Sequence, residues 1–162
     1  MVALLSRILT IALAVYSFLQ VSAPATGNSS GAHAADTAKI EFAIQILVGI
    51  IFFLVPFFPE AVHFGSRCLR DYAPEQLERI MPLLRDMTGL MGFVASLFFA
   101  INVQLLIRQA NSTAPREYGH TIAALTPWLI AGLLAAEVAT VLYYLRRFDA
   151  AANSANPIHN NG

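Results

Sequence analysis

A charged segment between two long apolar runs holds most of the side chains that could do chemistry. Residues 56–86 contain four arginines, five acidic residues, a histidine and the only cysteine of the chain. Glu60, His63 and Cys68 are of types that bind zinc, but a zinc site needs three or four ligands at compatible spacing. Neither a Cys-x-x-Cys nor a His-Glu-x-x-His motif occurs, nor does a Gly-rich phosphate loop or a nucleophile elbow. We therefore expect no metal, no cofactor and no enzymatic activity, and we interpret His63 and Arg67 as candidate loop residues at a membrane boundary.

The composition is that of a membrane protein. Of the 162 residues, 57% are hydrophobic and 12% are charged, and the formal net charge is zero. Soluble domains have about 45–50% apolar and about 25% charged residues, so this chain is too apolar to be soluble alone. A chain without net charge has no overall field that would attract nucleic acid. We therefore expect the lipid bilayer, and no nucleic acid, as a partner.

Four apolar stretches predict the architecture. They cover approximately residues 8–23, 40–58, 87–107 and 122–145. About 20 helical residues cross a hydrocarbon core of about 30 Å, and a span without water must satisfy its own backbone hydrogen bonds. The sequence predicts an all-α fold in which residues 1–162 form a single membrane domain with a bundle of four transmembrane helices. The small, polar residues of 24–39 and 148–162 predict a flexible outer loop and a flexible tail.

The first apolar stretch has two interpretations. Arg7, the apolar core and the small residues after it also have the order of a secretory signal. A small-x-small motif ends at Ala34, but it lies about ten residues beyond the apolar core, and Pro24 disfavours cleavage after Ala23. The pattern favours a retained helix, with a cleaved signal as the alternative.

The basic residues predict the orientation. With a cytoplasmic N-terminus and four spans, the inner segments hold Arg7, Arg67, Arg70, Arg79, Arg85, Arg146 and Arg147, and the outer ones hold Lys39, Arg108 and Arg116. Cytoplasmic excess of Lys and Arg sets membrane topology. Both termini are therefore predicted to be cytoplasmic.

The charged loop also contains an amphipathic pattern. Leu77, Ile80, Met81 and Leu84 recur at i, i+3, i+4 and i+7, and Pro74 suits a first helical position. This pattern predicts an amphipathic cytoplasmic loop helix. Its apolar face could lie at the membrane interface or pack on other protein.

Glu137 is the main candidate for function within the spans. An ionised side chain at the centre of a span costs about 2.5–3.5 kcal/mol, so Glu137 should be buried, paired or neutral. A neutral Glu137 that forms one hydrogen bond between helices is the favoured interpretation, with Thr10 as a possible partner at similar depth. The alternative is a small oligomeric proton-coupled transporter that uses Glu137.

Other polar and small residues predict how the helices pack. Gln45, Asn102 and Gln104 lie at similar depth and could form hydrogen bonds between helices or bind a small ligand, and the former is favoured. Ridges of small residues let helix backbones approach closely. One such ridge consists of Gly92, Ser96 and Ala100, and another of Gly132, Ala136 and Thr140. Whether each ridge packs within the chain or on another chain is left open.

Part of the chain resembles a known family. The segment Pro59-Glu60-Ala61-Val62-His63-Phe64-Gly65 is similar to one that follows a membrane helix in uncharacterised small multi-pass bacterial membrane proteins related to the SdpI-type immunity family. The stretch Tyr72-Ala73-Pro74-Glu75 and the later run Arg108-Gln109-Ala110-Asn111 resemble another segment of some members. The resemblance covers roughly residues 56–111, without the second proline before the histidine or the Asn-Ile-Pro-Asn run usual in the family.

The resemblance implies a bacterial inner-membrane protein that senses or neutralises a membrane-active toxin. The expected function is non-enzymatic, with an interaction, accessory or immunity-like role. Other membrane proteins or a second copy of the chain are the expected protein partners.

The predicted orientation can be tested with topology reporters. Fusions after Asp86 and after Asp149 should both report the cytoplasm, whereas a fusion after Ser112 should report the outside. The reason is that most basic residues lie in the segments predicted to be cytoplasmic. The opposite signals at Asp86 and Ser112 would overturn the orientation.

Overall fold

The computed structural model describes residues 1–23, 29–58, 63–64, 67–68, 72–112 and 115–153. Within these ranges, four helices are long and apolar enough to cross a membrane. They are α1 (Val2–Ser22), α2 (Ser29–Leu54), α3 (Pro74–Ala110) and α4 (Pro115–Asn153). A short 3-10 helix, η1 (Val55–Phe57), follows α2, and β1 (His63–Phe64) pairs antiparallel with β2 (Arg67–Cys68). The predicted all-α bundle is confirmed.

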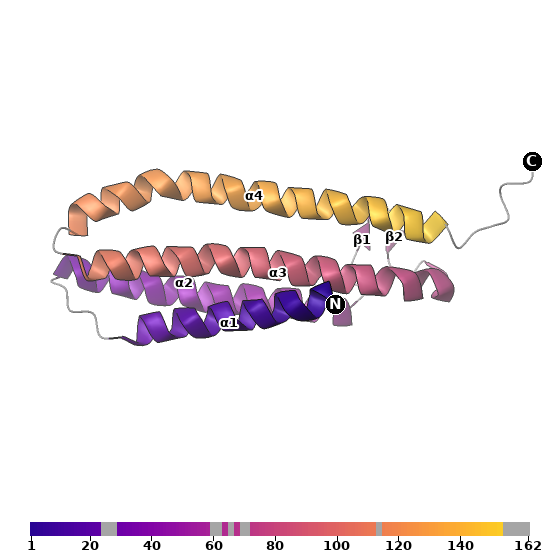
Figure 1. Ribbon diagram of the computed structural model, residues 1–162, viewed down its shortest axis with the longest axis horizontal. Coiled ribbons are helices and arrows are strands. Elements are labelled where there is room, and N and C mark those ends of the chain that lie inside the picture. Colours follow the sequence, from indigo (N-terminus) through magenta and orange to yellow (C-terminus); the bar gives the residue numbers. More distant parts are fainter. Residues whose placement is uncertain (24–28, 59–62, 65–66, 69–71, 113–114, 154–162) are drawn as a thin grey trace, which may run out of the picture.

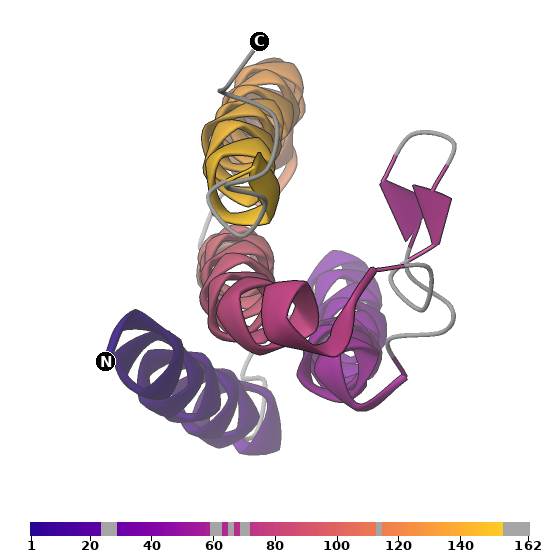
Figure 2. The same ribbon diagram turned by 90° about the vertical axis from the view of Figure 1, so that its right-hand side faces the viewer.

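Helix α3 is the centre of the bundle. The four helices run lengthwise beside one another, with the N-terminus, the start of α3 and the end of α4 at one end (Figure 1). Seen along the bundle, α1 and α2 lie on one side of α3 and α4 lies on the other (Figure 2). Most contacts between helices involve α3, and α1 and α2 make fewer contacts with each other than either makes with α3.

Helix α2 begins earlier than the hydropathy suggests. The expected flexible outer loop at 24–39 is helical from Ser29 onward, and residues 24–28 lie outside the described residues. Ala34, Ala35 and Ala38 are buried in this part of α2 and pack near the C-terminal end of α3. Small side chains let two helices approach closely, so tertiary packing favours helix where hydropathy alone predicts a loop.

The first and last spans are also longer than expected. Helix α1 begins at Val2 rather than near residue 8. Helix α4 runs through Asn153, so the first part of the expected flexible tail at 148–162 is helical. The buried ring of Phe148 explains this extension, because it packs on α3 and holds the last turns of α4 in place.

The amphipathic segment is helical, but it is the first part of α3 rather than a separate loop helix. Helix α3 begins at Pro74 and continues through Pro82 into the third span. Ile80 and Leu84 are 1% and 0% exposed and pack against Tyr144 and Phe148 of α4. This apolar face could lie at the membrane interface or pack on protein, and the structure shows that it packs on α4.

Two glycines let α1 and α2 approach α3. A Cβ atom on Gly89 would lie 2.6 Å from the Oγ atom of Ser6 in α1, and one on Gly92 would lie 3.1 Å from the Cβ atom of Phe52 in α2. The N-terminus of α1 is also held there, because the Ala3 N–H donates a hydrogen bond of 2.7 Å to the Asp86 carboxylate. The small residues of α3 therefore pack within the chain.

The ridge of small residues on α4 is only partly exposed, because Gly132 is exposed whereas Ala136 and Thr140 are half-buried. A Cβ atom on Gly132 would meet no atom within 4 Å. The Thr140 hydroxyl donates to the Ala136 carbonyl oxygen of its own helix, at 2.8 Å. Among the described residues, no helix packs on Gly132.

The close approach at Gly89 predicts a difference between two valine variants. Gly89→Val should lower the thermal stability in detergent, by about 1–3 kcal/mol, because the new side chain clashes with α1. Gly132→Val is the matched control and should have little effect, since its side chain points into open space. Equal melting temperatures for the two variants would contradict the packing of α1 on α3.

Candidate functional site: a cavity between three helices

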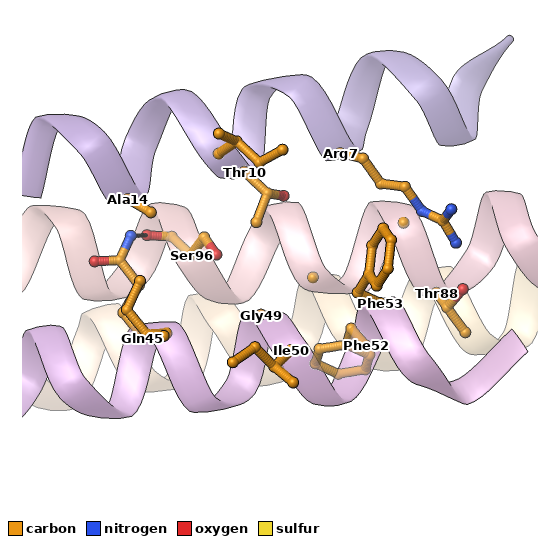
Figure 3. A pocket seen from close by; sticks show the side chains of 14 residues that line it. Arg7, Thr10, Ala14, Gln45, Gly49, Ile50, Phe52, Phe53, Thr88 and Ser96 are labelled. Carbon is orange, nitrogen blue, oxygen red and sulfur yellow. Dashed lines mark hydrogen bonds between the residues drawn. The ribbon is translucent and has the colours of Figure 1, made fainter. Parts of the chain in front are cut away.

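A cavity of about 210 Å³ lies between α1, α2 and α3. Figure 3 shows its lining side chains, which come from all three helices. An engineered apolar cavity of about 150 Å³ binds benzene, so a small organic molecule fits a space of this size. The cavity is therefore large enough for a ligand.

The cavity exists because small residues face one another where α1 and α2 pack on α3. Ala14 of α1 and Gly49 of α2 lie in its wall, and a Cβ atom on Gly49 would have only the Thr10 methyl group nearby, at 3.8 Å. Gly89 and Gly92 of α3 bring the backbones close without filling the space between them. The wall is otherwise mostly apolar, with Ile, Phe and Ala side chains.

One end of the cavity contains two buried polar groups that lack partners. Gln45 and Ser96 are each 1% exposed. The Gln45 Nε2 atom donates a hydrogen bond to the Ser96 carbonyl oxygen, at 3.2 Å (Figure 3). Neither Gln45 Oε1 nor Ser96 Oγ has a hydrogen-bond partner among the described residues. Leaving a buried polar group unpaired costs about 1–3 kcal/mol, so both atoms are suited to contact a bound molecule.

The other end of the cavity contains a guanidinium group. The Arg7 Cζ atom lies 4.9 Å from the centre of the Phe53 ring, a cation–π contact. The Arg7 Nε and Nη2 atoms are buried and have no hydrogen-bond partner among the described residues. Figure 3 shows Arg7 and Phe53 at the opposite end from Gln45 and Ser96. The cation–π contact offsets part of the cost of a charge within a span, but it leaves these N–H donors unused.

The three polar residues predicted to lie together do not form one cluster. Gln45 lines the cavity, whereas the Gln104 Oε1 atom accepts a hydrogen bond of 2.5 Å from the Tyr16 hydroxyl of α1. Asn102 is buried on α3. The bonds of Gln45 and Gln104 each connect two helices, but through Ser96 and Tyr16 rather than through one another.

Glu137 lies away from the cavity. It is half-buried on α4, which lies across α3 from α1 (Figure 2). The expected bond to Thr10 is not formed, because α1 and α4 lie on opposite sides of α3 (Figure 2), and the Thr10 hydroxyl donates instead to the Ser6 carbonyl oxygen at 2.9 Å. The Glu137 Oε2 atom is buried without a hydrogen-bond partner among the described residues.

The candidate loop residues lie in the hairpin of β1 and β2. His63 pairs with Cys68 and Phe64 pairs with Arg67 through their backbones. The side chains of His63 and Arg67 lie outside the described part of the structure, as does Glu60. Within the described part, no three His, Cys, Asp or Glu residues are placed to hold a metal ion.

Sequence reasoning missed Arg7 as a site residue, because it places Arg7 ahead of the first span. The helix begins at Val2, so Arg7 lies inside α1. Arg7, Thr10 and Ala14 recur at i, i+3 and i+7, which puts them on one helix face, and all three line the cavity. The spacing of these three residues is the sequence pattern that could have identified Arg7 as part of the site.

Comparisons with protein-family models, with curated proteins and with solved structures find no match.

Proposed function

We propose that this chain is a non-enzymatic accessory protein of a bacterial inner membrane that binds a small membrane-resident molecule between α1, α2 and α3. The observation that carries the proposal is the pair of buried, unpaired atoms, Gln45 Oε1 and Ser96 Oγ, at one end of an apolar cavity of about 210 Å³. A ligand that lies in the cavity and bonds to these atoms removes the cost of leaving them unpaired.

The chemistry of the wall supports binding rather than catalysis. Among the described residues that line the cavity, none carries a carboxylate, an imidazole or a thiol. The hydroxyl groups of Thr10 and Thr88 donate to backbone carbonyl oxygens of their own helices. Activation of a hydroxyl nucleophile needs an adjacent base, which this wall does not supply.

An immunity-like role is consistent with such a binding site. The resemblance of residues 56–111 implies a protein that senses or neutralises a membrane-active toxin, and an apolar cavity within a bundle suits a membrane-active molecule. The exposed face of α4 at Gly132 offers a surface for another membrane protein or a second copy. Both termini are proposed to lie in the cytoplasm.

The proposed binding can be tested with decan-1-ol as a probe. Decan-1-ol should raise the melting temperature of the protein in phosphatidylcholine nanodiscs, because a ligand that binds only the folded state stabilises it, by about 2.7 kcal/mol at 100 times its Kd. Gly49→Leu fills the cavity and should abolish the response. Gly132→Leu places the same side chain on the outer face and should retain it. Equal responses from the two variants would contradict binding in the cavity.

A second candidate function is proton-coupled transport through Glu137. The observation that favours it is that the buried Glu137 Oε2 atom has no hydrogen-bond partner among the described residues, so no structural bond accounts for this carboxyl group. A carrier must ionise during its cycle, whereas a structural carboxyl group need not.

The two candidates predict different results for Glu137→Gln. The substitution keeps the shape and bonding capacity of the side chain and removes its ionisation. On the leading proposal, Glu137→Gln keeps the melting temperature and the response to decan-1-ol, and proteoliposomes of both proteins show the same proton leak under a pH gradient. A proton flux that the wild type supports and a stable Glu137→Gln variant lacks would favour the transporter.

A further inference from the structure

The two ends of the cavity offer opposite hydrogen-bonding chemistry. At one end, the Arg7 Nε and Nη2 atoms are donors that carry positive charge and have no partner among the described residues. At the other end, the Gln45 Oε1 atom is an acceptor without a donor, and the Ser96 hydroxyl can both donate and accept. A molecule that satisfies both ends therefore has a negatively charged acceptor group at one end and a hydrogen-bond donor at the other.

The spacing along the helices sets the distance between the two groups. Arg7 and Ala14 are seven residues apart on α1, a rise of about 10 Å. Figure 3 shows Ala14 near Gln45 and Ser96, whereas the Arg7 side chain extends away from them toward the start of α1. Gly89 and Ser96 of α3 are also seven residues apart and line the same cavity. The two polar groups of the ligand are thus separated by about 10 Å or slightly more.

The middle of the cavity is apolar. Gly49 and Ile50 of α2 lie between the two ends (Figure 3), and Ile11 of α1 is a further apolar residue of the wall. The volume of about 210 Å³ is only moderately larger than the cavity of about 150 Å³ that holds benzene. The enclosed part accommodates one alkyl chain of about ten heavy atoms.

We propose that the cavity binds a single-chain acidic amphiphile with a hydrogen-bond donor about 10 Å along the chain from its acidic group. The acidic group pairs with Arg7 and the donor, such as a hydroxyl group, bonds to Gln45 and Ser96. This proposal rests on the proposed function, because it names the class of ligand for the same cavity.

Three probes of equal chain length separate the contributions of the two ends. They are 10-hydroxydecanoic acid, which carries both groups, decanoic acid, which carries only the acid, and decan-1-ol, which carries only the hydroxyl group. Their dissociation constants are measured by thermal stabilisation of the full chain in phosphatidylcholine nanodiscs, at a pH at which the carboxyl groups are ionised. The cavity-filled Gly49→Leu variant corrects for partitioning into the bilayer. We expect 10-hydroxydecanoic acid to bind at least about tenfold more tightly than either single-group probe.

Variants at each end should change the affinity for different probes. Arg7→Met should lower the affinity for both acids by about tenfold or more and leave the affinity for decan-1-ol unchanged, because only the acids bind the guanidinium group. Gln45→Leu should lower the affinity for 10-hydroxydecanoic acid and decan-1-ol and leave the affinity for decanoic acid unchanged. The probe that each variant still binds shows that the variant is folded. Gln104→Leu, which removes a hydrogen bond outside the cavity, should keep the wild-type order of affinities.

The outcomes distinguish this inference from the proposed function. If all three probes bind equally and Gly49→Leu abolishes binding, the cavity is a binding site but the inferred ligand class is wrong. If none of the probes binds in a manner that depends on Gly49, both proposals are wrong. Displacement of 10-hydroxydecanoic acid by phosphatidylglycerol in the nanodisc would assign the anionic group to a two-chain lipid and overturn the single-chain inference.

Discussion

The structure depends on the close approach of two helices to α3. Gly89 and Gly92 leave no room for a side chain between α3 and its neighbours, where Cβ atoms would meet Ser6 of α1 and Phe52 of α2. In a bilayer, lipid tails are as apolar as the side chains, so the hydrophobic effect does not drive helices together, and packing of this kind does. These two close approaches act together with the hydrogen bonds from Ala3 to Asp86 and from Gln45 to Ser96, which also hold α1 and α2 on α3.

The cavity follows from this arrangement. Because α1 and α2 each pack on α3 more than on one another, small residues such as Ala14 and Gly49 face a space that no side chain fills. Arg7, Gln45 and Ser96 place polar atoms at the two ends of that space, and some of those atoms have no partner among the described residues. Buried polar atoms are costly at this depth, so their presence in one cavity is the strongest indication of function in the described part of the chain.

The sequence predicts the spans well, because the length and composition of a transmembrane helix are constrained by the bilayer itself. It also predicts the ridge on α3, since Gly92 and Ser96 lie at the spacing that close packing requires. It does not predict which faces meet. The periodicity of Ile80 and Leu84 indicates an apolar face, but only the fold shows that α4 covers it. The role of Arg7 was missed for the same reason, because a basic residue near the start of a span usually reports orientation.

We propose that the space between α1, α2 and α3 holds an amphiphile in one orientation. The most direct measurement is nuclear Overhauser spectroscopy of the methyl-labelled protein in deuterated bicelles with 10-hydroxydecanoic acid. We expect contacts from the mid-chain protons of the probe to the methyl groups of Thr10 and Ile50, and contacts from the carbinol protons to the methyl group of Ala14. Contacts spread evenly over lipid-facing methyl groups, such as those of Leu134 and Val138 on α4, would contradict it.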